Sequence, residues 1–145
     1  MTLAQEREVP VPSYIKKSLQ QKGAVFNMSL FEELKDLGVD VDGGLKRING
    51  NEKLYTKLLG SFTKAVKTYD VQADFDADAC AEMIEKTHAI KGVSGNLSIT
   101  PVYESYTKIV DLLRAGNTED AKVLIREILP VQAKIVECIE SHMEQ

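Results

Sequence analysis

Apolar residues recur along the chain at spacings of three and four positions, the pattern of helices packed on one face. The alternation at every second position that is typical of strands is not convincing anywhere, and no internal repeat is visible. We therefore predict an all-α fold. Residues 1–28 have the weakest pattern and are assigned to an N-terminal extension or linker, with a short helix from Ser13 to about Gln21. Residues 29–145 are predicted to form one helical-bundle domain.

Helix start and stop signals divide residues 29–145 into elements. Ser29 and Glu32 form a capping box, and Gly38 provides the stop of this first short helix. A short turn or helix is expected over 39–48. Four longer helices follow, and we expect them at about 51–69, from Asp74 or Asp76 to 97, at 100–116, and from Thr118 onward with a kink at Pro130. Short connections favour antiparallel neighbours, so the prediction is an antiparallel up-down four-helix bundle with one or two extra N-terminal helices.

Two of the long helices have apolar stripes that we expect to face the core. In the helix over 51–69 the expected stripe consists of Leu54, Leu58, Phe62, Ala65 or Val66, and Tyr69. In the last helix it consists of Ala121, Leu124, Ile128, Val131, Ile135, and Cys138 or Ile139.

Composition narrows the class of protein. A chain of 145 residues with 43% hydrophobic residues has the size and core of one domain, and its net charge of −4 without a basic tract argues against a nucleic-acid partner. No apolar run reaches the roughly 18 residues of a membrane helix, and the N-terminus lacks the pattern of a secretory signal. Cys80 and Cys138 have no CxxC spacing, so we expect free, buried thiols, no metal site and a cytoplasmic location.

The segment from Thr87 to Leu97 contains two glycines inside a predicted helix, and each costs about 1 kcal/mol relative to alanine. At about 100° per residue, Gly92 and Gly95 share one face of this helix with His88 and Lys91. The apolar positions of the same segment point the other way. The helix surface beside the histidine therefore lacks side chains and carries one cation.

This pattern suits an exposed imidazole on which a bulky partner docks. Gly92 and Gly95 let a second protein approach the backbone closely, and Lys91 can attract an anion held at the ring. A neutral imidazole has one ring nitrogen free to act as a nucleophile, so His88 can form a covalent phosphohistidine.

The same segment resembles the signature of the histidine-containing phosphotransfer (HPt) domains of bacterial two-component phosphorelays, H-x-x-K-G-x-[SA]-x-N-[LI]-G. The matching residues are His88, Lys91, Gly92, Ser94, Asn96 and Leu97. Ser98 departs from the pattern, because the family usually has a final glycine there. The resemblance covers about residues 36–140.

The resemblance implies roles for these residues. His88 would be the phospho-acceptor, Lys91 would position the phosphoryl group, and Gly92 would make room for the receiver. The matches at Ser94, Asn96 and Leu97 would be structural. The chain would have no ATP-dependent kinase activity, no metal and no cofactor of its own, because Mg²⁺ would be bound by the partner. The expected partners are receiver domains of response regulators or hybrid sensor kinases, and the expected state is a monomer.

Several interpretations stay open. Ile84, one turn before His88, is either a receiver-binding contact or the edge of the core, and Gly95 either binds the receiver or allows close helix packing. His142 is expected to be a solvated residue of the C-terminal tail. An adaptor that docks receivers without transferring phosphate is the alternative function. An enzyme that uses His88 as a base or metal ligand would need a second ligand or a carboxylate, and no HExxH motif or paired histidines supply one.

Overall fold

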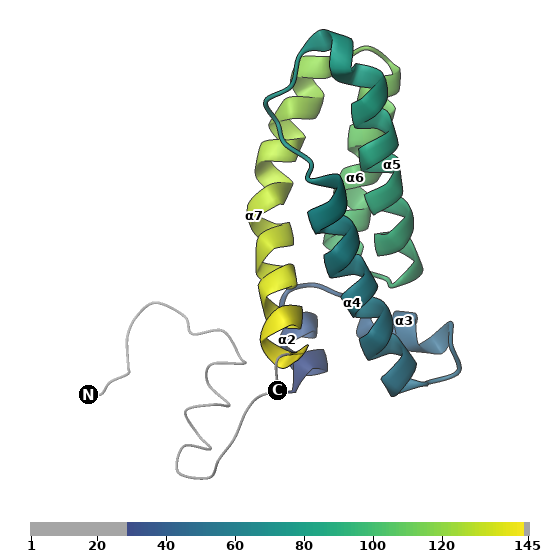
Figure 1. The fold of residues 1–145 in the computed structure, drawn as a ribbon. Helices are drawn as coiled ribbons and strands as arrows, with labels where there is room; N and C mark the ends of the chain where they lie inside the picture. The colour runs from purple at the N-terminus through teal and green to yellow at the C-terminus, as the bar shows by residue number, and fades with distance from the viewer. Residues whose placement is uncertain (1–28, 144–145) are drawn as a thin grey trace, which may run out of the picture.

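The computed structural model describes residues 29–143, and within this range the chain is helical without any strand (Figure 1). The elements in chain order are α2 (Leu30–Asp36), α3 (Val41–Lys46), α4 (Glu52–Tyr69), the 3-10 turn η1 (Ala77–Ala79), α5 (Cys80–Asn96), α6 (Thr100–Arg114) and α7 (Thr118–Met143). The all-α fold class is thus confirmed. The extension over 1–28 and its predicted helix lie outside the described residues.

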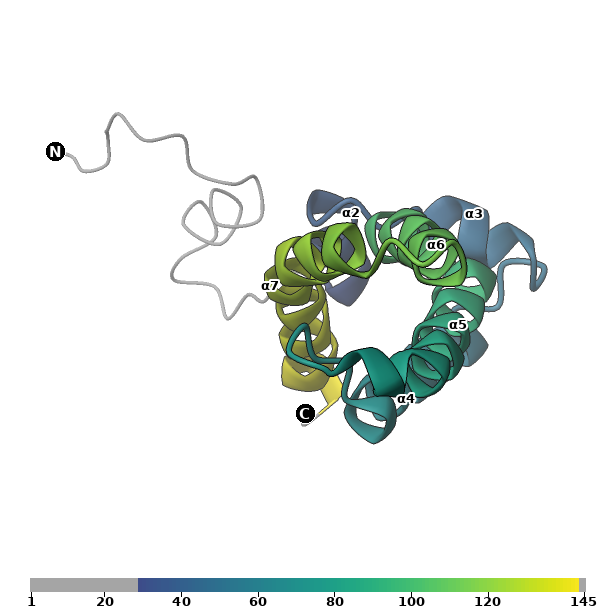
Figure 2. The ribbon, with the colours of Figure 1, turned by 90° about the horizontal axis from the view of Figure 1, so that it is seen from above.

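The four long helices pack around a common core. Helix α5 contacts α4 and α6, and α7 contacts α6 and α4, so that the four helices enclose the core when seen from above (Figure 2). The short helices lie at one end, where α2 contacts α7 and α3 contacts α4. No helix in the described part of the chain is long and apolar enough to cross a membrane.

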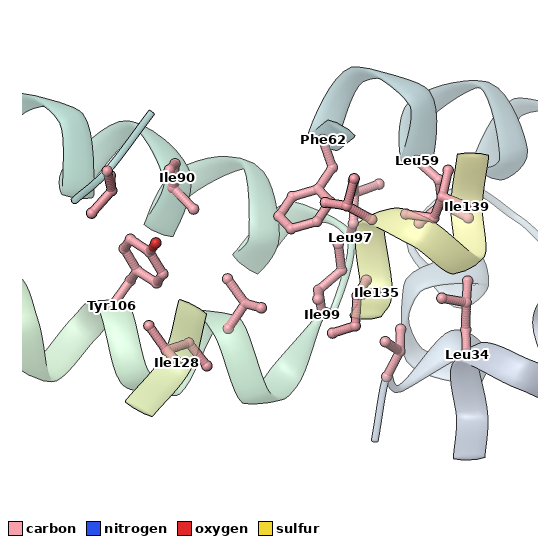
Figure 3. Packing of buried hydrophobic residues seen from close by; sticks show 14 of the residues in the cluster. Leu34, Leu59, Phe62, Ile90, Leu97, Ile99, Tyr106, Ile128, Ile135 and Ile139 are labelled. Carbon is pink, nitrogen blue, oxygen red and sulfur yellow. The ribbon is translucent and has the colours of Figure 1, made fainter. Parts of the chain in front are cut away.

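The core takes large side chains from all four long helices and from α2 (Figure 3). The labelled members are Leu34, Leu59, Phe62, Ile90, Leu97, Ile99, Tyr106, Ile128, Ile135 and Ile139. Burial of each such side chain stabilises the fold by about 1.5–3 kcal/mol before the entropy of ordering is subtracted.

The predicted helix boundaries agree with the structure at several positions. Ser29 Oγ accepts a hydrogen bond of 3.1 Å from the N–H of Glu32, as a capping box requires. Gly38 follows the helix with a φ of +94°, a conformation that glycine adopts without strain. Asn51 caps α4, since its side chain accepts from the N–H of Leu54 at 3.0 Å.

The predicted inward stripe of α4 is confirmed at Phe62, and Leu58 and Val66 pack against the core, but it is wrong at Leu54 and Tyr69. Leu54 and Tyr69 are 38% and 36% exposed, whereas Tyr55 and Leu59 are fully buried beside Phe62. Apolar residues occur as adjacent pairs in this helix, so hydropathy alone does not choose between the two faces. The choice follows from Tyr55, whose hydroxyl reaches a buried acceptor, the carbonyl of Leu97, at 2.6 Å.

The predicted stripe of α7 is confirmed except at one position, because Ala121, Ile128, Ile135, Cys138 and Ile139 are buried and Leu124 packs against the core. Val131 is exposed, and the polar side chain of Gln132 is buried in its place. This burial is possible because Gln132 Oε1 accepts a hydrogen bond of 2.7 Å from the hydroxyl of Tyr106. The helix continues through Pro130 to Met143.

We predict that the protein loses stability at alkaline pH. Burial, with a smaller effect of the Asp40 carboxylate, raises the pKa of Tyr55 from 10.0 to about 12 in the folded chain. The unfolded chain loses this proton first, so the stabilisation is fully present below pH 10.0 and is lost as the pH rises toward 12. Burial also raises the pKa of Tyr106. Urea unfolding across this pH range measures the decline.

Tyr55→Phe should lower the free energy of unfolding at neutral pH by about 1–3 kcal/mol, because the Leu97 carbonyl loses its donor. The alkaline decline of this variant should also be shallower than that of the wild type. Tyr69→Phe, on the surface of the same helix, is the matched control. A decline as steep in Tyr55→Phe as in the wild type would contradict this assignment.

Candidate functional site

Most of the predicted site residues of α5 lie along a hollow of about 420 Å³ beside the C-terminal half of this helix, whereas Ile84, Ser94 and Leu97 are not on its lining. It is lined by Asp40, Arg47, His88, Lys91, Gly92, Gly95, Asn96, Ser98, Thr100 and Tyr103. The imidazole of His88 is exposed, and Lys91 beside it is half-buried. The structure therefore brings together the histidine, the lysine and both glycines, in a concave surface rather than a flat one.

The two glycines have different surroundings. A Cβ atom added at Gly92 would meet nothing within 4 Å, so the helix surface there is open to an approaching partner. A Cβ atom at Gly95 would lie 2.8 Å from Cδ1 and Cε1 of Tyr103 in α6. The absence of a side chain at Gly95 thus lets the Tyr103 ring pack against α5. Of the two interpretations of Gly95, the distances support close helix packing, and a receiver contact there stays a prediction.

The hydroxyl-bearing residues on the inner face of α5 are satisfied by the helix itself. Ser94 is fully buried, and its Oγ donates to the carbonyl of Ile90 at 2.8 Å. Thr87, also fully buried, donates to the carbonyl of Met83 at 2.7 Å. These bonds let polar side chains occupy the core side of the helix without an unpaired group.

The remaining motif residues divide between core and surface. Leu97 is buried, and its carbonyl accepts the hydrogen bond of Tyr55. Asn96 is exposed on the lining of the hollow, so its position is unlike that of Ser94 and Leu97. Ile84 is half-buried and packs against the core cluster, which places it at the edge of the core.

Ser98 occupies a position that suits glycine. Its φ is +56°, in the left-handed region. The N–H of Ser98 donates to the carbonyl of Gly95 at 3.2 Å, and the N–H of Ile99 donates to that of Ser94 at 2.9 Å. This pair of bonds is a Schellman motif, which ends α5 and turns the chain into α6.

Arg47 is the cation of the hollow that sequence reasoning missed. It follows α3, and its Nη1 donates to the carbonyl of Gly95 at 3.0 Å, 48 residues further along the chain. Within residues 29–143, no carboxylate forms an ion pair with Lys91 or Arg47. Two positive groups are therefore available at the hollow, with Asp40 on its lining as the acidic residue.

No motif or spacing in the sequence indicates Arg47, because its place at the hollow depends on how α3 packs. A tertiary contact of this kind has no local signal.

Comparison of the chain with protein-family models, with curated proteins and with solved structures gave no match.

Alanine substitutions at the two glycines should have different effects on stability. Gly92→Ala should raise the free energy of unfolding by up to about 1 kcal/mol, because alanine favours the helix and its methyl group meets open space. Gly95→Ala should be less stable than Gly92→Ala by about 1–3 kcal/mol, because Tyr103 must move. Chemical denaturation of both variants measures the difference, and equal gains would show that the Tyr103 contact contributes nothing.

Proposed function

We propose that this chain is a histidine phosphotransfer protein of a two-component phosphorelay, which accepts a phosphoryl group on His88 and passes it to or from an aspartate of a receiver domain. One observation carries the proposal: an exposed imidazole, an ammonium group without a carboxylate partner among the described residues and the bare backbone of Gly92 meet on one hollow. The match of α5 to the HPt signature supports the same function.

Phosphoryl transfer requires from this chain a nucleophile, His88, and a cation near it, Lys91. A lone pair on a neutral ring nitrogen of His88 attacks the phosphorus of an aspartyl phosphate. The N–P bond forms as the P–O bond to the aspartate breaks, and the aspartate leaves as a carboxylate. The exposed ring can release the proton of its other nitrogen to water. Lys91 attracts the phosphoryl oxygens electrostatically, and the receiver would supply the Mg²⁺.

Arg47 is suited to a supporting role in this chemistry. Its guanidinium is anchored on the carbonyl of Gly95 and lies on the same hollow as Lys91. A guanidinium has several donors, so one can bind the helix end while others face an incoming anion. Two cations at the hollow would stabilise the negative charge on the oxygens of the phosphoryl group during its transfer.

We also propose the finer arrangement of an antiparallel up-down four-helix bundle for α4 to α7. Only residues 97–99 connect α5 to α6, and only residues 115–117 connect α6 to α7. Connections of this length favour antiparallel neighbours. Helix α4 contacts both α5 and α7, which supports its place as the fourth helix of the bundle. A cytoplasmic location, a monomeric state and the lack of ATP-dependent kinase activity belong to the same proposal.

The decisive test is phosphoryl transfer from a phosphorylated receiver. The wild type should acquire label on a group that is labile in acid and stable in alkali, and His88→Gln should acquire none. His142→Gln, the other histidine of the chain, is the matched control and should be labelled normally. Circular dichroism shows whether the helices persist. Labelling of a folded His88→Gln variant would overturn the assignment.

The alternative function, an adaptor that docks receivers without transfer, makes a different prediction for the same proteins. Receiver binding without label on the wild type would favour the adaptor. Binding of His88→Gln with wild-type affinity, together with labelling of the wild type only, supports the phosphotransfer protein.

A bulky side chain at Gly92 should slow transfer by obstructing the receiver. We expect Gly92→Leu to reduce the transfer rate by on the order of tenfold to a hundredfold while the fold persists, since misplaced reacting groups lose rate steeply. Gly60→Leu is the matched control, because Gly60 is also inside a helix and its Cβ would lie 3.9 Å from Met143 on α7. Equal transfer rates for the two variants would show that Gly92 does not face the docked receiver.

A further inference from the structure

Three side chains with metal-ligating atoms meet where α2 packs on the last turns of α7. They are Glu33, Cys138 and His142, and one ligand atom from each lies within 4.8 Å of the other two. His142 Nε2 lies 2.7 Å from Glu33 Oε2, and Cys138 Sγ lies 3.7 Å from Glu33 Oε1. His142 is therefore held against α2, and the prediction of a solvated tail residue is wrong.

The fold fixes this group from two directions. Cys138 and His142 are four residues apart on α7, so their side chains share one face of the helix. Glu33 comes from α2, and the contacts join residues 105 and 109 positions apart in the chain. No CxxC or paired-histidine spacing marks this group in the sequence, because the third ligand, Glu33, is brought there by the packing of α2 on α7.

The group is partly sheltered from water. Cys138 is 7% exposed, and the side chains of His142 and Glu33 are 16% and 24% exposed. Glu33 and Cys138 also line a second hollow, of about 360 Å³, together with Lys134, Glu137 and Ser141. A bound ion would thus have sheltered ligands and an open side for one more.

We propose that Glu33, Cys138 and His142 bind a Zn²⁺ ion, or a divalent first-row transition metal of similar preference, with water as the fourth ligand. The proposal is independent of phosphotransfer at His88.

Tetrahedral coordination requires the three side chains to rearrange by rotations about their own bonds. Zinc bonds of about 2.0–2.3 Å to nitrogen, oxygen and sulfur place ligand atoms about 3.3–3.6 Å apart. The two short contacts use different oxygens of Glu33: Cys138 Sγ lies 3.7 Å from Oε1, and His142 Nε2 lies 2.7 Å from Oε2. One oxygen must turn toward the ion, and the three ligand atoms, which lie within 4.8 Å of one another, must adjust to the tetrahedral spacing. The hydrogen bond between His142 and Glu33 would be replaced by two bonds to the ion.

The ligand types select the kind of metal. A thiolate with an imidazole suits zinc and related transition metals, whereas Ca²⁺ and Mg²⁺ prefer oxygen ligands alone. The thiolate forms when the ion displaces the proton of Cys138, which passes to solvent. Such an ion would tie α2, a helix of seven residues, to the C-terminal end of α7.

The test uses the untagged full chain, reduced and freed of metal by a chelator. Titration with Zn²⁺ should show one site, and Zn²⁺ should raise the melting temperature, because binding to the folded state stabilises it. Co²⁺ should give a thiolate charge-transfer band and the intense visible bands of tetrahedral coordination. Ca²⁺ should produce no shift.

Variants separate this site from other metal-binding groups. Cys138→Ser and His142→Gln should each weaken Zn²⁺ binding on the order of a hundredfold or more, in line with the sensitivity of metal sites to their ligands. Cys80→Ser and His88→Gln keep the site intact and should bind as the wild type does. His142, near the chain end, tests the site even if Cys138→Ser fails to fold.

Three results would overturn the proposal: no Zn²⁺ binding by the wild type, a Co²⁺ complex without the thiolate band, or equal losses in the control and ligand variants. None of these results depends on whether His88 is phosphorylated.

Discussion

Carbonyl groups at and just beyond the C-terminal end of α5 accept hydrogen bonds from other segments, and these bonds organise the elements around the hollow. The carbonyl of Leu97 accepts from the Tyr55 hydroxyl of α4, and that of Gly95 accepts from Arg47 beside α3. The carbonyl of Ser98 accepts from the N–H of Asp40 at 2.9 Å. Helix α4 and the residues at both ends of α3 are thus fixed on one end of α5, because each donates a hydrogen bond to a carbonyl there.

This helix end also decides how closely the segments approach. Gly44 of α3 faces the same place, where a Cβ atom would lie 2.5 Å from Tyr55 Cε1 and 2.8 Å from the Leu97 carbonyl oxygen. The backbone of α3 at Gly44 therefore packs directly against the hydrogen bond between the Tyr55 hydroxyl and the Leu97 carbonyl. Arg47 follows α3 directly, so the packing of α3 against this hydrogen bond also brings the Arg47 guanidinium to the hollow that His88 lines. The position of Arg47 thus depends on how α5 ends, because its guanidinium binds the Gly95 carbonyl in the last turn of that helix.

The sequence predicted what local chemistry determines. The capping box at Ser29, the glycine stop at Gly38 and the exposed place of His88 follow from neighbours within one or two helical turns. The choice of Tyr55 over Leu54 as the inward residue of α4 did not follow, because both are apolar and adjacent, and either can extend the stripe that includes Phe62. The deciding partner of Tyr55 is 42 residues away, and no periodicity contains that information. Arg47 and the contact of His142 with Glu33 were missed for the same reason.

The two helical glycines of α5 show how structure separates packing from function. Both break the local preference of a helix, and a sequence selected for stability alone would avoid them. At Gly95 the cost is offset, since the Tyr103 ring occupies the space that a side chain would take. At Gly92 nothing within the described residues occupies it, although the neighbouring turn carries His88. Local rules that are broken without a compensating contact are expected at functional sites. The open surface at Gly92 is therefore a stronger argument for an incoming partner than the presence of the histidine alone.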